Sequence, residues 1–544
     1  MADLKTTGSK AASRWRRPPA GWVGCRVLAA IVLLLGAARA EALTTAALLD
    51  TLQHTAFDYF WNQANPANGL IKDRSTSGSP CSIAALGFGL SAICIGIDHG
   101  WVTRDQGRAR ILTALQTLWN QPQGSGASGT IGYKGLYYHF LDMNTALRTW
   151  DSELSTIDTA LLFAGILDAK QYFATADAGD VQVRALADSI YQRADWEFMR
   201  NLGPAIRMGW KPGTGFQGFG NWIGYNEAMI LYILALGSPT HPVPASTWSA
   251  WTSGYSWQTQ YGYTYVVFPP LFGHQYSHCW IDFFNIRDAY MQARGITYFE
   301  NSRRATLAAR EYCIANPGHF VGYGPNLWGL TASDDPISGY AAHGAPPPQN
   351  DNGTITPTAA ASSIAFAPEV VVPALHHMYD TYGAQLWSTY GFKDAFNLTR
   401  NWWDTDYLGI DEGPIILMIE NYRNRGVWRR FLSNADIQLG LQRAGFGVAT
   451  DVEPAAIADV TLFQNVPNPV RGWTRIPFSL SAAGHVSLVL YDVSGRRVRE
   501  LTDGPWAAGR HEVPLNAQGL ASGVYYYRLE LNGKQVQRRC AVIR

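Results

Sequence analysis

The sequence predicts an all-α toroid, an (α/α)6 barrel, followed by a small immunoglobulin-like β-sandwich. Between residues 43 and 446, apolar residues recur at the i, i+3, i+4 spacing of helices in about a dozen segments. Long loops rich in glycine, proline and aromatic residues separate these segments, and such loops in a compact domain usually carry function. After residue 446 the pattern changes to the alternating spacing of strands. These observations favour a ring of helices with one face built from loops, followed by a separate β domain.

The expected helices lie, in chain order, at residues 45–61, 82–97, 104–119, 156–173, 181–200, 226–236, 277–292, 302–315, 359–380, 394–401, 414–425 and 428–443. The longest loops lie at residues 208–224, 239–275 and 323–358. The second of these loops contains three tryptophans and could therefore reshape a binding site: Trp248, Trp251 and Trp257.

Residues 1–42 have the pattern of a signal peptide. Residues 27–38 form a short apolar stretch, and Ala38-Arg39-Ala40 is a typical cleavage site. Four basic residues form the n-region: Arg14, Arg16, Arg17 and Arg26. The apolar stretch is short for a transmembrane helix, although an uncleaved anchor is the alternative. We therefore expect a secreted, cell-surface or periplasmic protein with no membrane span after cleavage.

The charge balance gives no reason to expect a nucleic-acid partner. There are 43 basic and 42 acidic residues, so no net positive field would attract polyanions. Charged residues make up only 16% of the chain and aromatic residues 13%, including 20 tryptophans. This composition suits either neutral sugars that stack on aromatic rings or simply a tryptophan-rich helical core.

The cysteines do not predict a metal site. Of the six, Cys25 lies in the signal peptide, and the other five include no C-x-x-C pair. A Cys81–Cys94 disulfide and buried free thiols are both compatible with the sequence. No nucleophile elbow, P-loop or dinucleotide fingerprint occurs in a strand–helix context, so we expect neither a metal nor an organic cofactor.

The C-terminal module is predicted at residues 460–544, after a linker at residues 447–459. Residues 487–491 and 523–529 have strand patterns, and turn sequences follow both.

Acidic residues recur where a glycine- and aromatic-containing loop leads into an apolar helix. Three segments show this pattern: WDSE at 150–153, GYNE at 224–227 and GIDEGP at 409–414. In a ring of helices, these segments would gather around one opening. Two carboxyl groups on either side of a sugar linkage are the requirement for glycoside hydrolysis.

Glu227 is the candidate general acid, because burial among aromatic residues would raise its pKa and keep it protonated. The alternative is a first-turn acid favoured by the helix dipole. Asp158 has capping-box spacing from Ser155, so it either caps a helix or contacts sugar. Asp151 and Glu153 precede that cap and are candidates for the general base.

Asp411 and Glu412 precede Pro414, which is expected at the first helical position. One of the two acids is expected to cap this helix and the other to face the site. Just upstream, Trp403 is a candidate platform for a pyranose ring, together with its neighbours Trp402 and Tyr407.

His278 and Asp282 are four residues apart and would share one face of a helix. They could either form a hydrogen bond at a helix end or both contact the sugar. Other aromatic residues in glycine-rich loops are further candidates for sugar binding: Trp210, Trp222, Tyr225 and Trp328.

Four segments resemble the glucoamylase-like domain of bacterial endo-β-1,2-glucanases and cyclic β-1,2-glucan synthases. They are WDSELSTIDTALL at 150–162, GYNEAMILYIL at 224–234, HCWIDFFNIRD at 278–288 and GIDEGPIILMIEN at 409–421. The resemblance implies an (α/α)6 barrel that hydrolyses β-glucan, most directly β-1,2-glucan, with inversion and without metal. It also implies Glu227 as the acid, and Asp151, Glu153 or Asp411 as the group that activates water.

The C-terminal module resembles the immunoglobulin-like sorting tails of bacterial secreted enzymes. Segments NVPNP at 465–469, VLYDVSG at 489–495 and ASGVYYY at 521–527 carry this resemblance. It implies export machinery as a partner, commonly the type IX route, and the alternative is a plain accessory β domain. For the whole chain, the rivals are a same-fold hydrolase or transglycosylase for another glucan linkage, and a non-catalytic glucan-binding protein.

Overall fold

The computed structural model describes residues 43–449, 460–480, 484–493, 495–507, 509–531 and 534–543. The predicted signal peptide lies outside these residues, as does most of the predicted linker. Residues 447–449 are described, and they still belong to the helical region. The first two residues of the predicted linker form β16 (Gly447–Val448), which pairs with β9 (Ile286–Arg287).

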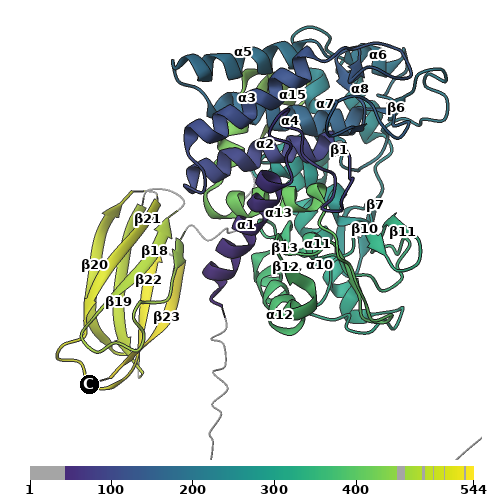
Figure 1. Ribbon diagram of the computed structural model, residues 1–544. Helices are drawn as coiled ribbons and strands as arrows, with labels where there is room; N and C mark the ends of the chain where they lie inside the picture. Colours follow the sequence, from purple (N-terminus) through teal and green to yellow (C-terminus); the bar gives the residue numbers. More distant parts are fainter. Residues whose placement is uncertain are drawn as a thin grey trace, which may run out of the picture. The chain divides into compact units, whose positions relative to one another are not determined.

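Four buried helices and one 3-10 turn close into a ring (Figure 1). The helix α2 (Ile83–Asp98) packs on α4 (Thr156–Tyr172), and α4 packs on α7 (Met229–Gly237). Both α7 and α13 (Gly409–Asn424) contact η2 (Tyr276–Cys279), and α13 packs back on α2. Most side chains of the four helices are buried on all sides, as expected for the inner layer of a helical domain.

Amphipathic helices cover this inner ring. The outer helices with inner partners are α1 (Thr45–Asn62) on α2 and α13, α3 (Arg104–Asn120) on α2, α5 (Ala178–Gln192) and α14 (Gly426–Leu432) on α4, and α15 (Ala435–Arg443) on α7. Within the inner ring, Gly87 and Gly165 allow α2 and α4 to cross closely. A Cβ atom added at Gly165 would lie 1.9 Å from the carbonyl oxygen of Gly87, so only glycine fits this crossing.

The strongly periodic helices match the prediction, since α1 to α4 begin and end within two residues of the expected bounds. Three other expected helices are each interrupted. Residues 428–443 divide into α14 and α15, where Asn434 caps the second helix. Residues 359–380 divide into α11 (Pro357–Ala361) and α12 (Pro368–Leu386), because Pro368 starts a new helix at its first position. Residues 181–200 divide into α5 and α6 (Trp196–Arg200), where Asp195 caps the second helix.

Two expected helices are wrong. Residues 277–292 contain η2, a loop, β9 and the short α9 (Ala289–Arg294). The Asp282 carboxylate accepts the Phe284 N–H at 3.0 Å, a local turn that competes with helix formation. Residues 394–401 instead include β14 (Phe396–Asn397), which pairs with β15 (Trp402–Trp403).

The long loops contain their own β-structure. In the first loop β6 (Gly209–Trp210) pairs with β5 (Leu154–Ser155), which ties that loop to the start of α4. The second contains the short helix α8 (Ser246–Thr252), the hairpin β7 (Trp257–Gln260) and β8 (Tyr263–Val266), and the turn η1 (Leu271–His274). In the third, β10 (Ala332–Asp335) pairs with β11 (Gly339–Ala342) between α10 (Tyr298–Ala315) and α11.

The C-terminal region is an all-β unit of two antiparallel sheets. One sheet has the order β17 (Val460–Leu462), β18 (Trp473–Leu480), β21 (Gly509–Asn516). The other has the order β20 (Arg497–Trp506), β19 (Gly484–Asp492), β22 (Gly523–Leu531), β23 (Lys534–Val542). Alternate residues of both sheets, such as Phe478 and Leu488, form one shared hydrophobic core.

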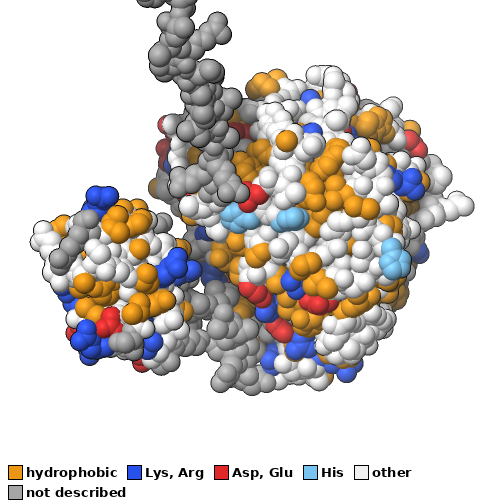
Figure 2. Space-filling view, turned by 90° about the horizontal axis from the view of Figure 1, so that it is seen from below, with side chains coloured by type: hydrophobic (Ala, Val, Ile, Leu, Met, Phe, Trp, Pro, Cys, Tyr) orange, Lys and Arg blue, Asp and Glu red, His pale blue; other side chains and the backbone are white. Residues whose placement is uncertain are grey.

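The five cysteines of the described residues are free and buried, so the alternative of a Cys81–Cys94 disulfide is wrong. In the described part of the chain, no helix has the length and apolar character needed to cross a bilayer. Figure 2 shows that acidic and basic side chains on one face of the helical region are few and lie near one another, in keeping with the balanced charge of the chain.

Candidate active site

Loops that lead into the inner helices bring together acidic, basic and tyrosine side chains that we call the acidic site. Its members are Asp73, Arg74, His139, Glu153, Asp158, Glu227, Tyr276, Asp334, Tyr340, Asp394, Asp404, Asp406, Asp411 and Glu412. Each lies close enough to another member to change its pKa or form an ion pair. Tyr276 and Tyr340 each lie near acids from different loops. The pKa of Tyr276 is raised first by burial and then by Asp411 and Glu227, and that of Tyr340 first by burial and then by Asp411 and Asp394.

Glu227 lies just before α7 rather than in its first turn. The helix begins at Met229, and Asn226 stops it from starting earlier because its side-chain oxygen accepts the Ala228 N–H at 3.0 Å. The carbonyl of Glu227 accepts a hydrogen bond from the Ser277 hydroxyl at 2.9 Å. Burial raises the pKa of the Glu227 carboxyl to about 7, and the nearby Asp158 carboxylate contributes to this rise. The acid is therefore partly protonated at neutral pH.

His139 connects two predicted site acids at the start of α4. Its Nδ1 lies 2.9 Å from Glu153 Oε1, and its Nε2 lies 3.6 Å from Asp158 Oδ2. Burial opposes the charged imidazolium, but Asp158 and Glu153 outweigh burial and raise the pKa of His139 to about 9. Burial would also raise the pKa of Glu153, and the hydrogen bond from His139 lowers it below its usual value.

Ser155 caps α4, as the sequence predicts. Its side chain accepts the Asp158 N–H at 3.3 Å, and its hydroxyl donates to Asp158 Oδ2 at 2.5 Å. Asp158 therefore belongs to the helix cap, and its carboxylate also lies within the acidic site. Its predicted contact with sugar stays a prediction.

Asp411 and Glu412 lie in the first turn of α13, and neither of them caps it. The helix begins at Gly409, five residues before Pro414, so the expected proline start is wrong. The flanking Leu408 has no capping side chain. Both acids are buried, and Pro414 lies inside the helix, where its missing N–H removes one backbone hydrogen bond.

Asp411 and Asp394 form a close acidic pair. Burial raises the pKa of both, to about 7 for Asp411 and well above the usual range for Asp394. Asp394 therefore keeps its proton and hydrogen-bonds to Asp411, which lowers the pKa of Asp411 relative to burial alone. The pKa of Glu412 is also raised, first by burial and then by Asp411. All three acids line a small recess beside Phe392.

Arg74 supplies a second positive charge to the acidic site, in addition to that of His139. Its Nη1 lies 2.8 Å from Asp334 Oδ2 and 3.5 Å from Asp406 Oδ2. Two groups of ligand-type side chains have oxygen or nitrogen atoms within 4.8 Å of one another: His139 with Glu153 and Asp158, and Asp334 with Asp394 and Asp404. Because the chain already places a cation in or beside each group, neither group requires a metal ion to balance its charge.

Asp151 lies outside the acidic site. Its carboxylate is 77% exposed and forms ion pairs with Arg148 at 2.6 Å and Lys211 at 3.3 Å. These two cations and their hydrogen bonds lower its pKa, with the Lys211 contact contributing most. A solvated carboxylate held by two cations is a weak base, so Asp151 does not suit the predicted role of activating water.

His278 and Asp282 are also not brought to the acidic site, because the helix expected to align them does not form. His278 is buried, with its Nε2 3.1 Å from the Ser302 hydroxyl, and burial lowers its pKa to about 3. Asp282 instead forms an ion pair with Arg425.

Most of the predicted stacking residues pack against the protein itself. Trp403 stacks on Phe396 at 5.1 Å with an interplanar angle of 3°, which covers one ring face. Trp210 packs against Tyr133 and Phe198. The remaining three lie in the protein interior: Trp222, Tyr225 and Trp328.

Sequence reasoning missed the acidic-site residues that lie on loops, on the hairpin β10–β11 and on the turn η2. They are Asp73, Arg74, His139, Tyr276, Asp334, Tyr340, Asp394, Asp404 and Asp406. The only local signal is that several acids stand in pairs beside aromatic residues, as Asp404 and Asp406 do after Trp402-Trp403.

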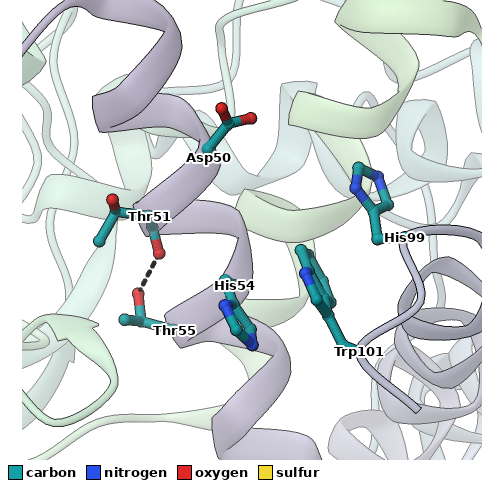
Figure 3. A pocket seen from close by; sticks show the side chains of 6 residues that line it. All are labelled: Asp50, Thr51, His54, Thr55, His99 and Trp101. Carbon is teal, nitrogen blue, oxygen red and sulfur yellow. Dashed lines mark hydrogen bonds between the residues drawn. The ribbon is translucent and has the colours of Figure 1, made fainter.

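A second group of polar residues lies at the far end of α2 (Figure 3). The ring of Trp101 is stacked with His54 at 4.5 Å and with His99 at 4.7 Å, and the three rings line a surface pocket together with α1 residues. His99 is the C-cap residue of α2, which is about 24 Å long. The loop before the N-terminal end of α2 contains Asp73 and Arg74 of the acidic site. Because His54 and His99 both stack on Trp101, this ring is not a free aromatic face for a sugar.

The chain is similar to known glycoside hydrolases. A family model described as "Putative glucoamylase" matches residues 220–435, and a secretion system C-terminal sorting domain matches residues 466–543. The exo β-1,2-glucooligosaccharide sophorohydrolase of Parabacteroides distasonis is 32% identical over 434 residues, covering 74% of this chain and 58% of that protein. The chain thus spans somewhat more than half the length of this curated relative.

Solved structures give the same result. The endo-β-1,2-glucanase of Chitinophaga pinensis is 32% identical, covering 75% of this chain and 99% of its own, with a TM-score of 0.69. The endo-β-1,2-glucanase of Talaromyces funiculosus shares the fold at 12% identity and a TM-score of 0.55, covering 72% of this chain and 88% of its own. These neighbours are of the α/α toroid type. The chain therefore belongs to the glucoamylase-like family of glycoside hydrolases, and it carries a C-terminal sorting domain.

Proposed function

We propose that the chain is a secreted, inverting glycoside hydrolase that cleaves β-glucan, most directly β-1,2-glucan, with Glu227 as the general acid. The observation that carries this proposal is the partly buried Glu227 carboxyl, whose pKa of about 7 keeps a proton available at neutral pH. The similarity to a β-1,2-glucan sophorohydrolase and an endo-β-1,2-glucanase supports the linkage.

Asp411 is the general base of this proposal. Among the three predicted candidates, Asp151 is solvated and Glu153 is held by the cation of His139, whereas Asp411 is buried and accepts a hydrogen bond from the protonated Asp394. Its pKa of about 7 suits proton uptake near neutral pH. Glu227 donates its proton to the glycosidic oxygen while Asp411 takes a proton from the attacking water. The new C–O bond then forms on the opposite face of the sugar from the bond that breaks.

The proposed architecture is an (α/α)6 toroid with an immunoglobulin-like sorting domain. The closed ring of inner helices and its outer layer support the first, and two sheets around one core support the second. The matched sorting domain supports export to the cell surface or the medium, with export machinery as the partner.

The test is reducing-sugar release by the purified protein from β-1,2-, β-1,3- and α-1,4-glucans. We expect release from β-1,2-glucan, with the first product in the α-anomeric form because the reaction inverts a β linkage. Glu227→Gln should lose at least about 100-fold in kcat, the lower range for a general acid. The control is Glu369→Gln, an exposed partner of Arg303 on α12, which should keep wild-type activity. A β-anomeric product contradicts inversion, and binding without release of reducing ends supports a glucan-binding protein instead.

A further inference from the structure

His139 occupies a position that only a charged imidazole ring satisfies. It lies between β3 (Leu136–Tyr137) and β4 (Phe140–Leu141), and its two ring nitrogens each face a carboxylate oxygen, of Glu153 and of Asp158. A neutral imidazole has one N–H donor and one lone pair, so one of the two carboxylates would face a lone pair. The doubly protonated ring presents a donor to both.

The surroundings of His139 favour the positive charge. The ring stacks on Phe140 at 4.0 Å with an interplanar angle of 13°, an arrangement that stabilises a cation over an aromatic face. The charged groups facing it are Glu153 and Asp158, from the start of α4, and Asp73, from the loop before α2. The side chain is 27% exposed, so the interaction with these carboxylates is only partly screened by water.

We infer that His139 is a positioning residue for the proposed reaction: its imidazolium ring holds the carboxylates of Glu153 and Asp158 in a fixed orientation within the acidic site that contains Glu227. This inference rests on the proposed function. Ser155 donates to the same oxygen of Asp158, Oδ2, that lies 3.6 Å from His139 Nε2, so two groups fix the position of this carboxylate. Oriented carboxylates near the acid accept hydrogen bonds from sugar hydroxyls and place the glycosidic oxygen near Glu227.

Loss of the ring charge has a definite electrostatic consequence. Without it, Glu153 loses the hydrogen bond that lowers its pKa, so Glu153 takes up a proton at a higher pH than before. Protonation of the base Asp411 already lowers the rate below about pH 7, and in the variants protonation of Glu153 should lower it further at acid pH. The basic limb of the pH–rate profile, set by Glu227, should change less.

The test uses two variants of the full-length protein that each retain one donor. His139→Asn keeps a donor near the Nδ1 position, and His139→Gln keeps one near the Nε2 position. We expect the kcat/KM of both variants on β-1,2-glucan, relative to wild type, to fall as the pH is lowered from 8 to 5.5. At pH 5.5 the loss should be about tenfold or more, with partial recovery at pH 8. The control is His99→Gln, which removes another histidine paired with a carboxylate, Glu420, outside the acidic site. A ratio of variant to wild-type kcat/KM that does not change with pH in both His139 variants would overturn the inference.

A second measurement separates this inference from the proposed function. The pKa of His139 is raised to about 9 in the folded protein from an ordinary 6.5, so its charge stabilises the fold below pH 6.5. That stabilisation is lost as the pH rises through about 9. In urea unfolding, wild type should therefore exceed His139→Gln by more at pH 6 than at pH 9.5. If the difference in stability between wild type and His139→Gln is equal at both pH values, the His139 ring is not charged in the folded protein, and the inference fails even if the enzyme is active. If the difference follows pH but wild type cleaves no glucan, the proposed function fails and the positioning role fails with it.

Discussion

Replacement of Glu227 by glutamine should inactivate the enzyme and, at the same time, stabilise it above neutral pH. The pKa of Glu227 is raised to about 7 in the folded protein from an ordinary 4.5. Between these two pH values the unfolded chain releases the proton while the folded protein retains it. The folded state therefore loses stability as the pH rises from 4.5 to 7, and the loss stays constant above that.

The size of this effect follows from the difference in pKa. A rise of about 2.5 in pKa, at about 1.4 kcal/mol for each pKa unit, gives about 3 kcal/mol. The side chain is partly open to solvent, which reduces the expected effect to about 2 kcal/mol. Glutamine has nearly the same shape and no proton to lose, so the variant avoids this destabilisation.

The assay is urea unfolding of wild type, Glu227→Gln and the exposed control Glu369→Gln at pH 5 and pH 8. The stability of Glu227→Gln relative to wild type should increase by about 2 kcal/mol between the two pH values, while Glu369→Gln should show no such change. An increase below about 0.5 kcal/mol would mean that Glu227 ionises normally in the folded protein, which would refute the reasoning for its role as the acid.

Three further substitutions test other parts of the structure. Asp411→Asn should lower kcat on β-1,2-glucan by about 100-fold or more, and added azide should restore turnover by replacing activated water as the nucleophile. Asp168→Asn should cost about 3–5 kcal/mol in urea unfolding at pH 7, because it leaves the buried Arg430 without the carboxylate that both its Nε (2.6 Å) and Nη2 (2.8 Å) contact. Asp151→Asn should change kcat less than twofold and stability by less than about 0.5 kcal/mol, as measured in the same assays.

The inner helices could be predicted because their apolar character is continuous and long. The start of α4 is fixed locally, since Ser155 accepts the Asp158 N–H within four residues of chain. The segment at 277–292 is equally apolar, yet its burial comes from tertiary contacts of individual rings. Trp280, for example, stacks on Phe88 at 4.8 Å and donates to Ser91 on α2. Periodicity cannot distinguish such a buried loop from a buried helix.

The same distinction applies to the acidic site. Glu227 and Asp411 could be singled out because each stands between a glycine-containing loop and an apolar helix, a pattern visible within ten residues of chain. Asp334 and Asp394 have no such neighbours. They reach the site only because the hairpin β10–β11 and the strand β14 meet beside α13 once the ring has closed, and that closure depends on contacts hundreds of residues apart.

The position of an acid relative to a helix start does not decide whether it keeps its proton. Asp411 lies at the third helical position, where the helix dipole favours negative charge, yet burial raises its pKa to about 7. Burial and the nearest charged group together set the pKa of each acid. His139 lies beside Glu153 and lowers its pKa, whereas the charged group acting on Glu227 is the carboxylate of Asp158, which raises it. One protonated and one ionised carboxyl can therefore both stand just before an apolar helix. A neighbouring cation, as at Glu153, favours the ionised form, and a neighbouring carboxylate, as at Glu227, favours the protonated form.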